Sequence, residues 1–308
     1  MSLRKTAAGS ASRGGAAGKG DAAELEGVRL SHPGRRLFAD PPITKLQLAR
    51  FYADIAEFIL PGMINRPVML LRCPDGAEGG QCFFQKHLSP GFGDAVREVL
   101  DAEDQQRWIY IEDLRGLLSL VQMNALEYHV WGCTVRDLDH ADRLVFDFDP
   151  APGVAWKQVV RSAQDLRERL EGLKLRSFVR TSGGKGLHLV VPIKPTPWSE
   201  AKDFCHAVAE TLAGEQPERY VAVASKARRE GKIFVDYLRN GRGATAVASY
   251  SLRNKPGAPI ATPLIWDELP RLRSPQQFTY ANIKRRLARL QDDPWKGFEQ
   301  LKQALPKT

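Results

Sequence analysis

The chain has 308 residues, a length that suits one large domain or two modest ones. Its net charge of +9 favours a polyanionic partner, with nucleic acid ahead of a membrane; a merely solvated basic surface is the alternative. A membrane-spanning or secreted protein is not expected. No apolar run approaches the roughly 18 residues needed to cross a bilayer, and the N-terminus lacks the apolar core of a secretion signal.

The four cysteines are expected to be reduced thiols of a cytoplasmic protein. Cys73, Cys82, Cys133 and Cys205 form no C-x-x-C pair, and three of them stand in apolar patterns. A zinc site made of Cys73, Cys82 and His87 is not favoured, because their spacing fits no zinc pattern.

Residues 1–24 are expected to form a flexible tail or an interdomain linker. They are mostly Ala, Gly, Ser, Lys and Arg, and such a segment buries too little apolar surface to offset its ordering entropy. If the segment is a linker, the chain is a fragment of a longer polypeptide. Residues 25–300 then form the folded domain, and residues 301–308 form a short C-terminal tail.

The first half of the domain is predicted to begin with a helix and to continue mainly with strands. A capping box at residues 44–47 begins the helix, because apolar residues follow at helical spacing until Pro61. A glycine-rich turn at 75–80 separates the first two strands. The expected strands are 67–71, 81–85, 108–111, 128–131 and 144–148, with a short helix at 114–123.

The second half of the domain mixes helices with short strand–turn–strand units. The expected helices lie near 159–170, 201–212 and 283–290, and the last of them is basic. The expected strands are 177–180, 187–191, 233–237 and 245–250. This interspersed order predicts an α+β fold with mixed or antiparallel sheets flanked by helices, rather than a doubly wound parallel sheet.

The strand at residues 144–150 ends in two alternating acids. Asp147 and Asp149 share one face of the strand, while Phe146 and Phe148 share the other. Carboxylates on a rigid backbone suit divalent metal ions in phosphoryl transfer, and a third carboxylate usually completes such a site. A solvated acidic face is the alternative, but the apolar character of the strand favours the metal site.

A glycine-rich turn, residues 180–188, resembles a phosphate-binding loop in composition. Its three glycines let the backbone approach an anion closely, while Ser182 and Lys185 add a hydroxyl donor and a positive charge. His188 begins the next strand. The spacing is not that of a P-loop. A simple hairpin turn is the alternative, although a turn does not require Lys, Ser and His together.

A second apolar strand, near residues 232–237, contains the single acid Asp236. A buried carboxylate is costly unless it is paired or binds a metal, so Asp236 is the natural third ligand; a salt-bridged core aspartate is the alternative. Basic residues that can cradle a triphosphate or DNA phosphates surround this strand in the sequence. They are Lys226, Arg228, Arg229, Arg239, Arg242 and Arg253.

Phe83 and Phe84 stand side by side in a short strand that is followed by cations. Adjacent strand residues face opposite ways, so one ring can lie in the core and the other at the surface. An exposed ring among cations is a stacking platform for a nucleic-acid base. Two core aromatics at a twist of the strand are the alternative.

The order D-x-D, then S-G-G-K-G-x-H, then an apolar strand ending in Asp resembles the three motifs of the archaeo-eukaryotic primase superfamily. With C-F-F-Q-K-H and I-T-K-x-x-L-A-x-F-Y, residues 28–295 closely resemble the polymerase domain of bacterial DNA ligase D. The resemblance implies a primase-polymerase-like fold and a template-dependent nucleotidyltransferase that repairs double-strand breaks by end joining. It also implies DNA ends and gaps, Ku, and the ligase and other domains of a parent polypeptide as partners.

The resemblance assigns the chemistry to two groups of residues. Asp147, Asp149 and Asp236 would hold two divalent ions, with manganese favoured over magnesium, beside an NTP or dNTP substrate. Residues in and near the motifs would contact the incoming triphosphate. They are Ser182, Lys185, His188, Arg72, Arg229 and Arg253.

The resemblance also implies contacts to the base, the sugar and the DNA. Phe83 and Phe84 would stack on the incoming base or the DNA, and His129 would contact the sugar hydroxyls. Arg35 and Lys45 would grip the 5′-phosphate of the downstream strand. The family prefers ribonucleotides, so a site that accepts a 2′-hydroxyl is expected.

Two other functions are compatible with parts of the sequence. A haloacid-dehalogenase-type phosphatase also begins with an apolar strand ending in D-x-D, with Asp147 as its covalent nucleophile. That mechanism needs an acidic pair on a later strand, where this chain has Asp236 alone. A non-catalytic module that positions a ligase on DNA ends would explain the charge, but it gives no reason for three acids in apolar strands.

Overall fold

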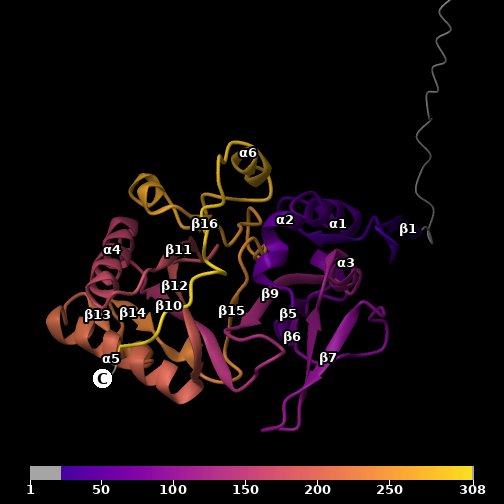
Figure 1. Cartoon of the computed structure of the whole chain (residues 1–308). Helices are drawn as coiled ribbons and strands as arrows, with labels where there is room; N and C mark the ends of the chain where they lie inside the picture. Colours follow the sequence, from indigo (N-terminus) through magenta and orange to yellow (C-terminus); the bar gives the residue numbers. More distant parts are fainter. Residues whose placement is uncertain (1–21, 307–308) are drawn as a thin grey trace, which may run out of the picture.

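The computed structural model describes residues 22–306 of the chain (Figure 1). Residues 1–21 of the expected N-terminal tail lie outside the described residues. The expected tail boundary at residue 24 is wrong. Ala22–Leu25 form strand β1, which pairs antiparallel with β2 (Val28–Ser31), so regular backbone pairing begins before the predicted boundary.

The expected C-terminal tail from residue 301 is also corrected by the structure. Gln303 forms a bridge with Ile193. Its side-chain amide donates to the backbone carbonyl of Pro192 at 2.9 Å, and its side-chain oxygen accepts from the backbone nitrogen of Arg176 at 2.7 Å. These contacts fix the end of the described chain to the larger sheet.

The larger sheet has six strands and forms one half of the molecule (Figure 1). They are β10 (His140–Pro150), β11 (Phe178–Thr181), β12 (Leu187–Pro197), β13 (Tyr220–Val221), β14 (Ile233–Asp236) and β16 (Pro263–Leu264). Their order is β13–β14–β10–β12–β11–β16, and every pair is antiparallel except β13 with β14. The strand with the two alternating acids, β10, therefore has a neighbour on each side.

The smaller sheet has four antiparallel strands in the order β15–β9–β5–β6. They are β5 (Val68–Arg72), β6 (Phe83–Gln85), β9 (Ala125–Trp131) and β15 (Thr245–Val247). Besides β1 and β2, two short pairs accompany this sheet: β3 (Arg36–Phe38) with β4 (Ile43–Thr44), and β7 (Val96–Leu100) with β8 (Arg107–Ile111).

The helices flank the two main sheets. They are α1 (Lys45–Asp54), α2 (Ala56–Ile59), α3 (Leu114–Gln122), α4 (Trp156–Gly172), α5 (Trp198–Glu215) and α6 (Ile283–Leu287). Short 3-10 segments are η1 (Leu60–Gly62), η2 (Gly76–Glu78), η3 (Lys226–Arg228), η4 (Leu238–Asn240) and η5 (Trp266–Arg271). α4 and α5 pack on the larger sheet, and α1 and α3 pack together beside the smaller one (Figure 1).

Local signals in the sequence explain where the helices of the first half begin. The hydroxyl of Thr44 accepts from the backbone nitrogen of Gln47 at 3.3 Å, and the Gln47 side chain accepts from the backbone nitrogen of Thr44 at 2.8 Å. This capping box starts α1 as predicted. Asp113 caps α3 in a similar way by accepting from Gly116 at 2.8 Å. Within the described residues, no helix combines the length and apolarity that a bilayer span requires.

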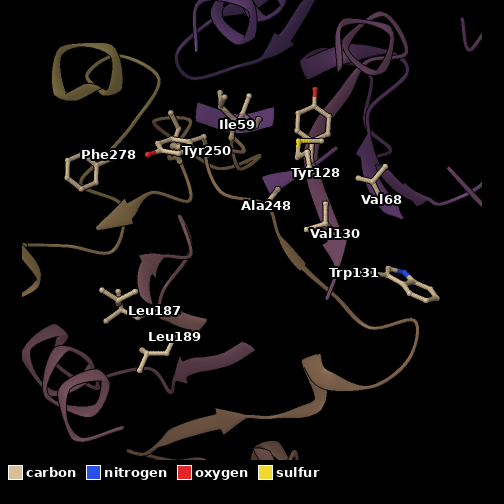
Figure 2. Packing of buried hydrophobic residues seen from close by; sticks show 14 of the residues in the cluster. Ile59, Val68, Tyr128, Val130, Trp131, Leu187, Leu189, Ala248, Tyr250 and Phe278 are labelled. Carbon is tan, nitrogen blue, oxygen red and sulfur yellow. The ribbon is translucent and has the colours of Figure 1, made fainter. Parts of the chain in front are cut away.

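The two faces of β10 have different surroundings. Phe146 and Phe148 are fully buried in the main core, which extends from the helices of the larger sheet to the smaller sheet. Figure 2 shows members of this core from both sheets, among them Leu187 and Tyr128. Val145 lies on the other face, in a small separate cluster with Phe298. The acids share this second face, away from α4 and α5.

The predicted fold class is confirmed: helices flank mixed and antiparallel sheets. Several expected elements are shorter in the structure than in the prediction; the strand expected at 81–85, for example, is Phe83–Gln85. The strand expected at 245–250 ends at Val247, and the helix expected at 283–290 ends at Leu287.

Candidate active site

Strand register brings the three predicted metal-binding acids to one face of the larger sheet. Asp147 of β10 lies directly opposite Asp236 of β14, and on its other side it lies opposite His188 of β12. Asp149 follows two residues later on the same face. Gly186 of the glycine turn is held against the same strand, because a Cβ at this position would stand 1.7 Å from the carbonyl oxygen of Phe148.

These side chains line a cavity of about 330 Å³ whose walls come from both main sheets. The larger sheet contributes the acids and the glycine turn, and the smaller sheet contributes β9 and β15. The predicted site residues that line it are Asp147, Asp149, Asp236, Ser182, Lys185, His188, His129 and Arg253. The cavity therefore places cations and a glycine-rich turn next to the acids, as a nucleoside triphosphate site requires.

Two arginines neutralise the acids. Arg239 Nη2 lies 3.4 Å from Asp147 Oδ2, and its Nε lies 3.4 Å from Asp236 Oδ2. Arg229 Nη1 donates to Asp149 Oδ2 at 3.2 Å. Arg239 is one of several basic residues expected to cradle phosphates, but its contact with the acids is not predicted from the sequence. In the sequence, Arg239 follows Asp236 by three residues, and the 3-10 segment η4 brings the two side chains into contact.

The three acids differ in how readily they ionise. Burial would raise the pKa of Asp147, but His188 and Arg239 outweigh it and lower that pKa to about 2. Burial and the charge of Asp147 raise the pKa of Asp149. Burial also raises the pKa of Asp236, and Asp147 adds to the effect although Arg239 opposes it. Carboxylates that repel one another in this way favour a multivalent cation between them.

The chemistry of this donor set fits a hard divalent ion. Carboxylate oxygens are the ligands that magnesium and manganese prefer, and three of them share one sheet face. In the part of the chain that the structure describes, no three His, Cys, Asp or Glu side chains are already arranged around a metal position. Arg229 and Arg239 contact the carboxylate oxygens instead.

Arg180, which is not among the predicted site residues, contacts the ring nitrogen of His188 that does not face Asp147. Arg180 Nη2 donates to His188 Nδ1 at 3.1 Å, and Arg180 Nη1 donates to the hydroxyl of Ser249 at 3.1 Å. His188 Nε2 therefore carries the proton of the neutral ring and lies 3.5 Å from Asp147 Oδ1. Burial lowers the pKa of His188, which keeps the ring neutral at physiological pH.

The hydroxyl of Ser182 organises the glycine turn. It accepts from the backbone nitrogens of Gly184 and Gly186 at 3.2 and 3.3 Å, and it donates to the carbonyl of Gly186 at 3.0 Å. Gly183 has φ of +64°, and a Cβ there would lie 2.8 Å from Arg253 Cγ, so the position requires glycine. Lys185 is exposed at the tip of the turn, where its charge lies near Asp149.

His129 and Arg253 also line the cavity. Arg253 Nη1 donates to the backbone carbonyl of Ser182 at 2.6 Å. Both side chains are held by Glu127: His129 Nε2 and Arg253 Nε each donate to Glu127 Oε2 at 2.9 Å. Glu127 is not among the predicted site residues, although its alternation with His129 on β9 places both on one face.

A second basic cluster consists of Arg35, Lys45 and Arg72. Lys45 Nζ donates to the carbonyl of Gln122 at 2.9 Å, and Arg72 Nε donates to the carbonyl of Met123 at 2.7 Å. Burial, with Arg35 and Arg72 nearby, lowers the pKa of Lys45 to about 8. The predicted triphosphate contact of Arg72 is thus not supported, because the end of β5 places it beside Lys45 and outside the cavity lining.

Phe83 and Phe84 are both exposed, by 46% and 56%, so neither ring lies in the core and the alternative of two core aromatics is wrong. β6 is the edge strand of its sheet, and neither of its faces is covered there. The guanidinium of Arg72 lies 5.7 Å from the ring centre of Phe83, and the ring centres of Phe84 and His129 are 5.6 Å apart. The two rings therefore stand between the basic cluster and the cavity.

Two of the four cysteines are not reduced thiols. Cys73 and Cys82 form a disulfide that joins the end of β5 to the start of β6. The antiparallel pairing of these strands brings the two residues together, a proximity that their spacing alone does not reveal. Cys133 and Cys205 are free and buried, as expected. The side chain of Asn254 lies 3.8 and 3.6 Å from the two disulfide sulfurs.

Comparisons with known proteins agree with the motifs. The family model of the LigD primase-polymerase domain matches residues 44–295. A multifunctional non-homologous end joining protein LigD of Pseudomonas aeruginosa is 40% identical over 287 residues, which is 92% of this chain and 34% of that protein. Its counterpart in Mycolicibacterium smegmatis is 33% identical over 255 residues, 80% of this chain and 33% of that protein. The chain thus spans about a third of these relatives.

The fold agrees as well. A solved structure of the polymerase domain of Mycobacterium tuberculosis ligase D in complex with DNA superposes with a TM-score of 0.80 at 30% identity, covering 89% of this chain and 98% of that one. These findings exclude the phosphatase and the non-catalytic module as alternatives. The chain belongs to the LigD primase-polymerase domain family and is a DNA-directed nucleotidyltransferase of the archaeo-eukaryotic primase superfamily.

Proposed function

We propose that the chain adds single nucleotides, ribonucleotides in preference, to the 3′ ends of DNA at breaks and gaps during end joining. The observation that carries the proposal is the register that sets Asp147 opposite Asp236 in a cavity shared with the glycine turn. Acids, cations and a glycine-rich turn in one cavity suit a metal-bound triphosphate. Membership of the LigD family supports the role in end joining.

Asp147, Asp149 and Asp236 would hold two divalent ions, with manganese preferred to magnesium. When bound, such ions lower the pKa of an attacking hydroxyl and stabilise a pyrophosphate leaving group. The 3′-oxygen of the primer attacks the α-phosphorus, and the bond from that phosphorus to pyrophosphate breaks. The site therefore needs cations at the triphosphate as well as acids at the attacking oxygen.

The chain supplies those cations and donors itself. Lys185, at the tip of the glycine turn, and Arg253, packed against that turn, both line the cavity, where they can bind the β- and γ-phosphates. His188 presents Nε2–H as a further donor. Ser182 fixes the conformation of the turn by accepting from the backbone amides of Gly184 and Gly186. His129 would contact the sugar hydroxyls and so favour ribonucleotides.

The basic cluster is proposed to hold the 5′-phosphate on the far side of a gap. Arg35 and Lys45 were expected to have this role, and Arg72 joins them in space. Phe83 and Phe84, between this cluster and the cavity, would stack on the bases that span the gap. The relatives that match this chain are multidomain LigD proteins, so we extend the proposal to ligase domains and Ku as partners on bacterial chromosomal DNA in the cytoplasm.

A single-nucleotide extension assay on a gapped duplex with a 5′-phosphate tests the proposal. We expect addition of one templated nucleotide, faster with ribonucleotides than with deoxyribonucleotides, and faster with manganese than with magnesium. Absence of any addition with either metal and either sugar would contradict the proposed function. Equal rates for the two sugars would contradict the ribonucleotide preference alone.

A further inference from the structure

Glu127 is a buried carboxylate whose oxygens hold other groups at the nucleotide cavity. Its side chain is 5% exposed and stands on the same face of β9 as His129. Oε2 accepts from His129 Nε2 and from Arg253 Nε, each at 2.9 Å, and Oε1 accepts from the backbone nitrogen of Asn254 at 2.7 Å. Three donors therefore converge on one carboxylate.

Arg253 connects this carboxylate of the smaller sheet to the glycine turn of the larger sheet. Its Nε donates to Glu127, and its Nη1 donates to the carbonyl of Ser182 at 2.6 Å. The contact is close, since a Cβ on Gly183 would lie 2.8 Å from Arg253 Cγ. A change at Glu127 therefore alters the contacts that hold the Arg253 side chain beside the glycine turn.

Glu127 also determines which ring nitrogen of His129 is free to accept a hydrogen bond. An ionised carboxylate only accepts hydrogen bonds, so Nε2 carries the proton in this contact and Nδ1 is the acceptor of the neutral ring. Burial would raise the pKa of Glu127, but the hydrogen bond from His129 and the charge of Arg253 outweigh it and lower that pKa to about 2. The carboxylate therefore stays charged throughout the physiological range.

We propose that Glu127 is a positioning residue for the incoming nucleotide, holding Arg253 toward the triphosphate and His129 toward the sugar. The inference rests on the proposed function, because it needs a nucleotide in this cavity. Glu127 touches no reacting atom in this arrangement and acts through its two partners. Its removal weakens nucleotide binding more than it slows the chemical step.

The variant Glu127→Gln tests the inference with little change in side-chain volume. It keeps an oxygen that can accept from both Arg253 and His129, but it loses the charge, and its amide NH2 then faces the backbone N–H of Asn254, so that two donors meet without an acceptor. We expect the KM for the nucleotide to rise about tenfold, as for the loss of one charge-assisted hydrogen bond, while kcat changes less than about threefold. Glu127→Asp keeps the charge but has a shorter side chain, and we expect it to show the same rise in KM with little change in kcat.

Glu268→Gln is the matched control. Glu268 forms an ion pair with Arg286, whose side chain is 11% exposed, and neither residue lines the cavity. This variant should lower the melting temperature without changing the KM for the nucleotide. A purely structural role for Glu127 predicts that Glu127→Gln behaves in the same way.

A double variant shows whether Glu127 acts through Arg253. We expect the KM of Glu127→Gln with Arg253→Lys to be no higher than that of the more severe single variant. The inference would be overturned if the increase in KM of the double variant equalled the product of the increases in the two single variants. It would also be overturned if both Glu127→Gln and Glu127→Asp had a KM within about twofold of the parent. A parent enzyme that adds no nucleotide would instead contradict the proposed function, so the two failures are distinct.

Discussion

The carboxyl groups of Asp147, Asp149 and Asp236 share one sheet face but have different partners. Asp147 lies between His188 and Arg239, which keep it ionised down to a pH of about 2. The side chain of Asp149 is 51% exposed and pairs with Arg229. Asp149 is therefore the acid whose replacement disturbs the folded sheet least, which makes it the cleanest probe of the proposed metal site.

Replacing Asp149 with Ala should reduce nucleotide addition by about 10³-fold or more, because a carboxylate that neutralises charge at the reacting phosphate is lost. Binding of a gapped duplex should stay within about threefold of the parent, since the basic cluster is intact. Extension rates and DNA affinity are measured on the same protein. Asp292→Ala, an acid whose side chain is 66% exposed, is the control and should leave both unchanged. Extension by Asp149→Ala near the parent rate would rule out Asp149 as a ligand.

Lys45 should make recognition of the 5′-phosphate depend on pH. Its pKa is lowered to about 8, so the ammonium loses its proton as the pH rises through that value, and the attraction for phosphate is lost on the alkaline side. Bound phosphate stabilises the ammonium, so the loss extends to somewhat higher pH in the complex. We expect the affinity ratio of 5′-phosphate to 5′-hydroxyl gaps to fall by up to about tenfold per pH unit above this pKa.

The measurement compares that affinity ratio at pH 7 and at pH 9.5. Lys45→Arg is the matched variant, because a guanidinium keeps its charge across this range. Its ratio should stay nearly constant. An equal fall in the parent and in Lys45→Arg would show that another group controls the pH dependence.

Single residues also show what the sequence can predict of the site. Asp147 and Asp149 are predictable because their alternation on a strand is local. Glu127 and Arg180 are not, since their roles arise from contacts with residues that are distant in sequence or on another strand. Arg72 is misplaced by sequence reasoning for the same reason: only the position of β5 in the smaller sheet decides which cluster it joins.

At the scale of elements, predictability follows how local the stabilising contacts are. The helices with strong apolar periodicity, such as α4 and α5, lie where the sequence places them. The strands β13 and β16 have two residues each and exist only because neighbouring strands pair with them. Such strands carry no periodic signal of their own. The disulfide was missed in the same way, because it depends on the pairing of β5 with β6.

The Cys73–Cys82 disulfide should stabilise the hairpin that carries the exposed rings. It closes a loop with a sequence separation of 9, and the chain-entropy model assigns to a loop of this size about 2–3 kcal/mol of stabilisation. Reductant should therefore lower the melting temperature of the parent protein, measured by thermal unfolding with and without dithiothreitol. The variant with both Cys73→Ser and Cys82→Ser should melt lower and show no response to reductant. A parent protein that melts at the same temperature in both conditions would contradict the prediction.

At the scale of the whole molecule, the fold separates the two regions that we propose to bind phosphate and places the exposed rings of Phe83 and Phe84 between them. The cavity with the acids lies where the two main sheets meet, and the basic cluster lies at the end of β5 and the start of α1. The side chains of Phe83 and Phe84 contact Arg72 on one side and His129 on the other. A gap with a 5′-phosphate can therefore engage both regions at once, while a simple 3′ end engages one.

This arrangement predicts a specific salt dependence. Each phosphate neutralised by a cation releases about 0.9 counterion, so the slope of log affinity against log salt reports how many phosphates are held. Arg35→Gln with Lys45→Gln should make that slope shallower by about 1–2 on a gap with a 5′-phosphate. On the same gap with a 5′-hydroxyl, the double variant and the parent should have nearly equal slopes, because the phosphate that these residues hold is missing.

The control is a double variant that removes two positive charges from the opposite side of the larger sheet. Lys157 and Lys174 are exposed at the start of α4 and just beyond its end, on the side that faces away from the cavity. Their double replacement with Gln should leave the slope and the 5′-phosphate preference unchanged. If it lowers the slope as much as the replacement of Arg35 and Lys45, DNA binding depends on net charge alone. In that case the basic cluster is not a built phosphate site, and the proposed bridging of a gap fails with it.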